Sequence, residues 1–253
     1  MKTNKKVVII SAIVTYCIVI VFLNYIFGRQ KIQKDNKQSA EIGISEPSTY
    51  SQNDQEETVK SITTIDFESL KKRNEDIYAW ITIPGTDIDY PVVKKMDSND
   101  PFDDYYLSHT VDHEEGFPGA IYSHPFSDVY FTDAVTILYG HNLKDGGMFT
   151  ALHDFEDKKF FNENDTIIIH TQTGDLTYKI FAVSNFSDVF IPEEYAFSDL
   201  KEVERYLKDI KDSSINFRND IKVVADSKLL TLSTCYTNQD AVRLLVVGVL
   251  CEE

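Results

Sequence analysis

Two apolar patterns divide this chain of 253 residues. Val7 to Phe27 is a run of 21 residues without a charged side chain, whereas the apolar residues after Tyr78 come in short blocks separated by turn-forming residues. At ~1.5 Å per residue, the long run makes a helix of about 30 Å, which matches the hydrocarbon core of a membrane. The short blocks are typical of β-strands. The pattern therefore predicts one membrane span followed by a mainly β domain.

About eight of the short blocks have the length and composition of strands. Many are rich in Val, Ile, Thr and Tyr, and turn dipeptides such as Pro84-Gly85 separate them. So many strands with so few helices do not fit a doubly wound parallel sheet, and a closed or nearly closed β-barrel fits better. The expected strands are residues 79–83, 88–93, 119–123, 134–139, 166–171, 176–189 (one bent strand or two), 229–234 and 241–250.

Three segments predict helices at the periphery of the barrel. Asp66 to Asn74 has helical spacing, with Asp66 as a candidate N-cap, and Met148 to Asp154 predicts a brief helix. Asp199 to Asp212 is longer and is expected to cover one face of the barrel. Its apolar stripe consists of Leu200, Val203, Leu207 and Ile210.

The first 64 residues predict a tail, an anchor and a stalk. Residues 1–6 are short and basic, and we interpret them as a cytoplasmic tail. Residues 7–27 fit an uncleaved signal-anchor better than a cleaved signal peptide, whose apolar region would span only ~7–15 residues. Residues 28–64 are polar without an apolar period and are expected to form a disordered stalk, the alternative being a loosely packed start of the domain. The globular domain is expected over residues 65–253. Basic residues flank the span on both sides, so charge alone does not orient it.

Charge and cysteine content narrow the function classes. The chain has 41 acidic and 25 basic residues and a net charge of −16, which argues against nucleic acid as a partner. The three cysteines are Cys17, inside the apolar run, Cys235 and Cys251. We predict no structural disulfide, because pairing Cys235 with Cys251 would consume a candidate nucleophile. Cys251 is expected to be a packed, inert thiol.

The candidate chemistry centres on Cys235. It ends the segment Thr231-Leu232-Ser233-Thr234-Cys235, and a hairpin centred near Gln239 would place it opposite Arg243. Side chains alternate along a strand, so Ser233 and Cys235 share a face. A guanidinium beside a thiol favours the thiolate and can hold a substrate oxyanion. The alternative is that Cys235 is an inert buried cysteine and Arg243 a surface charge. Three roles are open for Ser233: a contact with the substrate, a support for Arg243, or a strand hydroxyl whose hydrogen bonds are satisfied within the fold.

A cysteine nucleophile needs a histidine or another cationic partner. Of six histidines, His141 is the best candidate, because it follows the strand-like run 134–139 in Tyr139-Gly140-His141-Asn142. The glycine is expected to let the backbone turn sharply. Asn142 is interpreted as a turn residue, the alternative being a role in orienting His141. His109 and His124 are expected to be structural, although either can lie near a substrate groove. The acidic run 97–104 predicts a solvated loop rather than a calcium site.

Taken together, these motifs resemble those of the sortases, the cysteine transpeptidases of Gram-positive cell surfaces. The Thr-Leu-Ser-Thr-Cys form is similar to class B, as are Tyr106-Leu107-Ser108-His109 and Gly147-Met148-Phe149 in their places along the chain. The resemblance covers about Ile65 to the C-terminus. It implies an eight-stranded sortase barrel with Cys235, His141 and Arg243 as catalytic residues and no cofactor or metal.

The resemblance also implies substrates and a location. The expected substrates are secreted proteins with a C-terminal sorting motif, cleaved after Thr through a thioester and transferred to a peptidoglycan amine. The catalytic domain is expected outside the cell, held to the membrane by the N-terminal helix. Two alternatives remain: a thiol endopeptidase that releases its product to water, and a tethered binding module in which Cys235 is inert.

Overall fold

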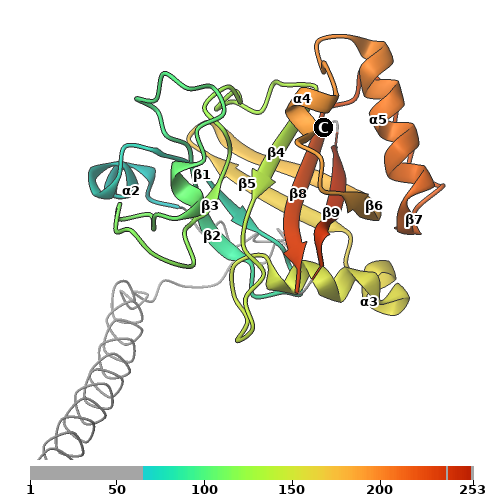
Figure 1. The fold of residues 1–253 in the computed structure, drawn as a ribbon, viewed down its shortest axis with the longest axis horizontal. Coiled ribbons are helices and arrows are strands. Elements are labelled where there is room, and N and C mark those ends of the chain that lie inside the picture. The colour runs from blue at the N-terminus through green and yellow to red at the C-terminus, as the bar shows by residue number, and fades with distance from the viewer. Residues whose placement is uncertain (1–64, 238, 252–253) are drawn as a thin grey trace, which may run out of the picture. The chain divides into compact units, whose positions relative to one another are not determined.

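A ring of strands forms the centre of the part of the chain that the computed structural model describes, residues 65–237 and 239–251. The hydrogen-bonded order is β5-β1-β2-β3-β4-β8-β9-β6, and pairing of β6 with β5 closes the ring (Figure 1). Within the described residues this is an eight-stranded barrel, with β7 added at the edge of β6, so the mainly β prediction is confirmed. The strands are β1 Ile77–Thr82, β2 Asp89–Val93, β3 Ile121–Tyr122, β4 Val135–Tyr139, β5 Thr166–Thr171, β6 Gly174–Ser187, β7 Ser214–Phe217, β8 Leu229–Tyr236 and β9 Gln239–Leu250.

Two strands differ from the sequence-based expectation. The segment predicted as one bent strand or two is the single strand β6, whose register against β9 shifts between Ile180 and Ala182. The short β7 was not predicted. Its four residues, Ser-Ile-Asn-Phe, pair only with β6 among the described strands, so they carry little of the apolar pattern of a central strand.

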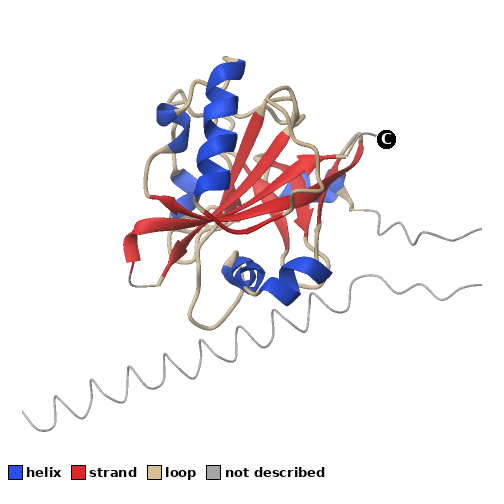
Figure 2. Cartoon of the chain, turned by 90° about the vertical axis from the view of Figure 1, so that its right-hand side faces the viewer, coloured by secondary structure: helices blue, strands red, loops and turns tan. Residues whose placement is uncertain are grey.

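The helices lie outside the ring of strands (Figure 2). Asp66 caps α2 through a hydrogen bond from Ser69 N, and Asp199 caps α5 through one from Lys201 N, as the sequence predicted for Asp66. The brief helix expected at Met148 is a 3-10 helix that starts slightly later. The helices are α2 Phe67–Arg73, η1 Tyr105–Leu107, η2 Thr150–Glu156, α3 Lys158–Glu163, α4 Ile191–Glu194 and α5 Leu200–Asp212.

The helix α5 packs outside the barrel against β6 and β7, and its apolar side chains share one buried cluster with residues of β8 and β9. Its buried residues are Val203, Tyr206 and Ile210, whereas Leu200, predicted on the apolar stripe, is 55% exposed because it lies in the first turn. Tyr206 was missed: its ring is buried, and its hydroxyl lies 2.8 Å from Thr231 Oγ1 on β8. Burying an aliphatic side chain such as Ile210 contributes about 1.5–3 kcal/mol to stability.

The strands β8 and β9 are buried on both faces. Leu230 and Leu232 point into the barrel core, while Leu229 packs in the cluster beneath α5. Strands covered on both sides read as continuous apolar runs rather than as alternating patterns. This double burial explains the run of Val and Leu in β9 and gives Cys235, near the end of β8, a rigid support.

Within the described residues, no helix has the length and apolarity needed to cross a membrane. The predicted tail, anchor and stalk fall in residues 1–64, outside the described residues, and stay predictions.

Candidate active site

The hairpin of β8 and β9 places Cys235 and Arg243 opposite each other. The two residues are Cα partners in the antiparallel ladder, which confirms the predicted pairing. Both strands extend further toward the turn than the predicted ranges 229–234 and 241–250, because β8 continues to Tyr236 and β9 begins at Gln239. The register shifts between Cys235 and Tyr236, so the ladder becomes irregular immediately after the cysteine.

The parallel pairing of β4 with β8 brings His141 to the same edge of the sheet. Tyr139 pairs with Ser233, and His141 and Cys235 each follow two residues later. Two further hydrogen bonds hold the strand ends together, Gly140 N to the Ser233 carbonyl at 3.2 Å and Thr234 Oγ1 to the Gly140 carbonyl at 2.8 Å. Because parallel neighbours end side by side, segments more than 90 residues apart in sequence converge here.

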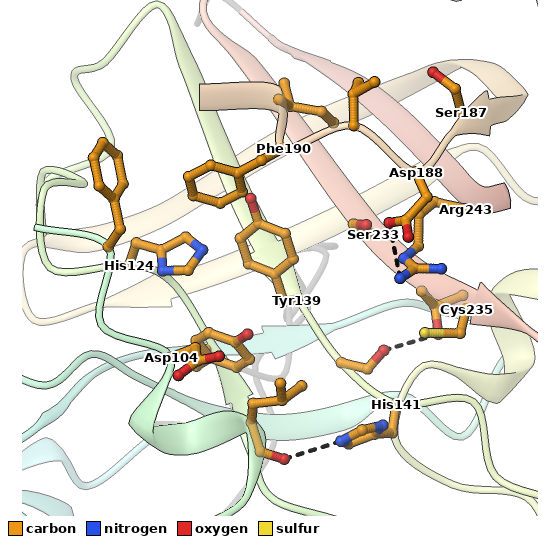
Figure 3. A pocket seen from close by; sticks show the side chains of 17 residues that line it. Asp104, His124, Tyr139, His141, Ser187, Asp188, Phe190, Ser233, Cys235 and Arg243 are labelled. Atoms are coloured by element: carbon orange, nitrogen blue, oxygen red, sulfur yellow. Dashed lines mark hydrogen bonds and ion pairs between the residues drawn. The ribbon is translucent and has the colours of Figure 1, made fainter. Parts of the chain in front are cut away.

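Cys235, His141 and Arg243 line one cavity of about 400 Å³. Figure 3 shows the three side chains along one side of this cavity, with His124 and Phe190 at its other end. A volume in this range suits a short peptide segment or a drug-sized ligand. Cys235 is partly exposed and also borders a second hollow, together with Phe117 and Asn142.

The ring of His141 is oriented by a backbone carbonyl. His141 Nε2 lies 2.9 Å from the carbonyl oxygen of Leu107, which can only accept, so Nε2 carries a proton. Nδ1 is therefore the ring nitrogen that remains for exchanging a proton with a substrate. Phe117 packs against the same ring, with centroids 4.9 Å apart.

Gly140 is required for close packing. Its φ angle is not among the positive values of the described glycines, so this position does not use the left-handed conformation that glycine favours. A Cβ atom at this position would lie 2.5 Å from Ile121 Cδ1 and 2.7 Å from Phe149 Cδ2, and both of those side chains are buried. The absence of a side chain lets the residue before His141 lie directly on the barrel core.

Arg243 forms an ion pair across the cavity wall. Its Nη2 lies 2.8 Å from Asp188 Oδ1, and its Nη1 donates to the Val242 carbonyl at 3.2 Å. Asp188 follows β6, and its backbone N–H donates to the Ala241 carbonyl at 3.0 Å, which extends the β6–β9 ladder to the carboxylate. The carboxylate orients the guanidinium and balances its charge beside the thiol.

Neutral aromatic groups form the far end of the cavity. Burial lowers the pKa of His124, whose ring lies 4.9 Å from Tyr139 and 5.2 Å from Phe190 between centroids. Burial raises the pKa of Tyr139 and of Tyr122, and Asp104 and Cys235 add to the shift at Tyr122. These phenols are therefore neutral at physiological pH. The cavity has a thiol, an imidazole and a guanidinium near one end, whereas aromatic rings and the carboxylate of Asp104 line the other (Figure 3).

A family model described as a sortase domain matches residues 81–251 of the chain. The chain belongs to the sortase family. It is 32% identical to sortase B of Listeria monocytogenes over 206 residues, which cover 81% of each protein. It is 28% identical to sortase B of Staphylococcus aureus over 186 residues, which cover 72% of this chain and 73% of that protein.

The fold agrees with this assignment. The structure of Clostridium perfringens sortase B superposes with a TM-score of 0.66 at 29% identity, covering 74% of this chain and all of that one. These likenesses identify the chain as a class B-like sortase, a cysteine transpeptidase, and they confirm the resemblance inferred from the motifs. Since the family is enzymatic, the interpretation as a non-catalytic binding module loses its support.

The remaining predicted residues of the sortase divide into those near the cavity and those outside it. Ser233 lines the cavity and is 5% exposed, and its role stays a prediction. Asn142 reaches the carbonyl of Cys235, at 3.1 Å, with its side chain. His109 stacks on Tyr105, as expected for a structural histidine. Cys251 is free, as predicted, but it is exposed and not packed, because it follows the end of β9.

Sequence reasoning missed two contributors to the site. Asp188 lay at the end of a block interpreted as strand, where nothing in the sequence pointed to Arg243. His153 was one of six histidines and had no motif around it, yet its Nε2 lies 3.1 Å from the carbonyl of Cys235. Its spacing to Glu156, three residues on and just beyond the predicted helix 148–154, was the one available signal.

Proposed function

We propose that this sortase is anchored to the membrane by its N-terminal segment, cleaves a C-terminal sorting motif after Thr and transfers the protein to a peptidoglycan amine. The observation that carries the proposal is the meeting of a thiol, an imidazole and a guanidinium at one end of a single cavity. The related S. aureus sortase B, 25% identical with a TM-score of 0.62, has been solved as a substrate complex covering 74% of this chain and 84% of that one.

The first half-reaction is acylation of Cys235. The thiolate attacks the carbonyl carbon of the motif's Thr, and the new oxyanion is stabilised by the guanidinium of Arg243. Collapse of this intermediate breaks the C–N bond. His141, which has become imidazolium by taking the thiol proton of Cys235 at Nδ1, gives this proton to the leaving amine while Nε2 keeps its bond to Leu107. The products are a thioester on Cys235 and the free C-terminal fragment.

The second half-reaction transfers the acyl group. A peptidoglycan amine attacks the thioester carbonyl and gives a proton to His141, and the C–S bond then breaks to regenerate the thiolate. The second hollow at Cys235, with Phe117 and Asn142, offers the amine an approach separate from the acyl chain. Transfer requires the amine to outcompete water, so exclusion of water from the thioester matters as much as the three catalytic groups.

The experiment uses the full-length protein and a library of peptides with a central Thr, incubated with and without triglycine or diaminopimelic acid. Mass spectrometry should find an acyl adduct on Cys235 and an amine-joined product, and Cys235→Ala should form neither. Turnover by Cys235→Ala at the parent rate would contradict the proposal. Hydrolysis as the sole reaction, even with a saturating amine, would instead identify a thiol endopeptidase.

Anchoring is tested separately from catalysis. Residues 7–27 are apolar and long enough to span a bilayer. The full-length protein should stay with membranes through alkaline carbonate extraction, and protease added outside intact cells should digest the catalytic domain. Release by carbonate, or protection from external protease, would refute the proposed location while leaving the transpeptidase proposal intact.

A further inference from the structure

The carbonyl oxygen of Cys235 is held by the same segment that carries His141. Asn142 Nδ2 donates to this carbonyl at 3.1 Å, and His153 Nε2 lies 3.1 Å from it. Asn142 directly follows His141, and His153 lies on η2. Two side chains from one stretch of chain thus converge on the backbone of the nucleophile.

Glu156 fixes the ring of His153. Glu156 Oε1 lies 2.6 Å from His153 Nδ1, and because a carboxylate only accepts, Nδ1 carries a proton. Nε2 then faces the Cys235 carbonyl and, at 3.0 Å, the amide nitrogen of Asn142. When Nε2 has no proton, it accepts a hydrogen bond from the Asn142 amide, and the second hydrogen of that amide goes to the Cys235 carbonyl. When Nε2 has a proton, it donates to the carbonyl itself. The carbonyl has a side-chain donor in both states.

The backbone at Cys235 lies where regular pairing ends. The ladder shifts register between Cys235 and Tyr236, and such bulges re-aim side chains next to active sites. The ring of Tyr236 packs edge-on against His153, with centroids 4.8 Å apart. A peptide group released from the regular ladder needs other contacts to keep one orientation.

We propose that Asn142, His153 and Glu156, the carbonyl clamp, are positioning residues that fix Cys235 relative to His141. Phe149 N donates to the His141 carbonyl at 3.0 Å, so the imidazole and the clamp belong to one folded loop. His153 and Glu156 are not among the described residues that line the cavity, so their effect passes through Cys235. The kinetic consequence rests on the proposed function, because a misplacement of about 1 Å can cost ~100-fold in rate.

The central variant is His153→Phe in the full-length protein. Phenylalanine keeps a ring against Tyr236 but removes both nitrogens. We expect kcat for the selected sorting peptide to fall about tenfold, with KM within about twofold of the parent. His153→Gln keeps an amide able to donate to the carbonyl and should recover most of the loss. The matched control is His170→Phe on β5, which breaks a similar histidine–carboxylate contact, to Asp175 at 2.8 Å, away from Cys235.

A second measurement needs no substrate. His153 either donates to the Cys235 carbonyl or accepts from Asn142 and holds that amide against the carbonyl. In protein labelled with carbonyl-¹³C cysteine, His153→Phe should therefore weaken the hydrogen bonding of the Cys235 carbonyl and move its NMR signal upfield. The signal should stay in place in His170→Phe. This result depends only on the clamp, so it separates failure of the clamp from failure of the proposed transpeptidation.

The outcomes are decisive in both directions. The clamp is refuted if folded His153→Phe keeps the parent carbonyl shift and the parent kcat. It is also refuted if His153→Gln is as impaired as His153→Phe, because the effect would then follow from the loss of the imidazole and not of the donor. If His153→Phe does not fold, Glu156→Gln replaces it, because this change weakens the hydrogen bond to His153 Nδ1. Glu156→Gln must then show an upfield shift and a fall in kcat, each smaller than the change predicted for His153→Phe.

Discussion

Asp188 Oδ1 lies 2.8 Å from Arg243 Nη2, at the end of the cavity that contains Cys235. The carboxylate side chain is 42% exposed and the arginine side chain 28% exposed, so water screens the pair in part. Its contribution is orientation, because the planar guanidinium presents its donors in a fixed fork. The first prediction follows from this contact.

Asp188→Asn should lower turnover of the selected sorting peptide without unfolding the protein. Partly exposed pairs contribute about 0.2–1 kcal/mol, which corresponds to a loss of roughly 1.4- to fivefold in kcat/KM. Steady-state kinetics check this. Asp112→Asn is the matched control, because it breaks the ion pair of Asp112 with Arg73, at 2.6 Å on the distant α2, and should leave turnover unchanged. Equal rates for Asp188→Asn and the parent would show that Arg243 needs no such support.

Arg243→Lys should remove most of the activity. Lysine keeps a positive charge for Asp188 but loses the two-pronged donor geometry, and loss of one oxyanion donor costs about 100- to 1,000-fold in kcat. Arg218→Lys is the control: Arg218 donates to the Ile180 carbonyl at 2.7 Å, away from the cavity, so its replacement should affect stability and not rate. Near-parent activity of Arg243→Lys would remove the guanidinium from the mechanism.

Gly140→Ala should destabilise the barrel and impair His141. The new methyl group would collide with Ile121 and Phe149, and overpacking of this kind costs about 1–3 kcal/mol of the free energy of unfolding. Denaturant unfolding measures the loss. The Phe149→Leu substitution makes room for the new methyl group. It should therefore lower the free energy of unfolding by less in the Gly140→Ala variant than in the parent, with a coupling energy between the two substitutions of about 0.5 kcal/mol or more. Additive effects would mean that the ring and the methyl group do not meet.

His124 should make stability depend on pH. Burial lowers its pKa, and the carboxylates of Asp104 and Asp100 oppose this shift more weakly. The unfolded chain therefore binds more protons below the ordinary histidine pKa of about 6.5. The neutral ring contributes stability that is complete above about pH 6.5 and is lost as the pH falls toward the lowered pKa.

The test compares the parent with His124→Phe in denaturant unfolding at pH 8, 7, 6 and 5. The free energy of unfolding of the parent should fall relative to the variant between pH 7 and 5. The difference between the two should be constant between pH 8 and 7. A constant difference over the whole range would show that His124 titrates normally in the folded state.

The sequence predicted the parts of the site that depend on strand pairing. Alternation and the length of the turn were enough to place Cys235 opposite Arg243, and the strand before His141 was enough to place the histidine at a sheet edge. Such inferences succeed because register follows from a short local pattern with a period of two residues.

Contacts that depend on tertiary packing were not predicted from the sequence. Asp188 and His153 meet the site only through the closed barrel, and neither has a local motif. Gly140 was expected for its backbone freedom, but the deciding contacts are with Ile121 and Phe149, which are remote in sequence. Tyr206 was not on the predicted apolar stripe of α5, yet it is buried and its hydroxyl lies 2.8 Å from Thr231 Oγ1.

The parallel pairing of β4 with β8 also determines when His141 can meet Cys235 and Arg243 during synthesis of the chain. Antiparallel neighbours can form as a local hairpin, but parallel neighbours require the chain to leave the sheet and return. The thiol and the guanidinium lie on β8 and β9, whereas the imidazole lies just after β4, about a hundred residues earlier in the chain. During synthesis, β1 to β7 therefore emerge before Cys235 and Arg243 do. The imidazole becomes part of a complete site only once the hairpin of β8 and β9 has been made.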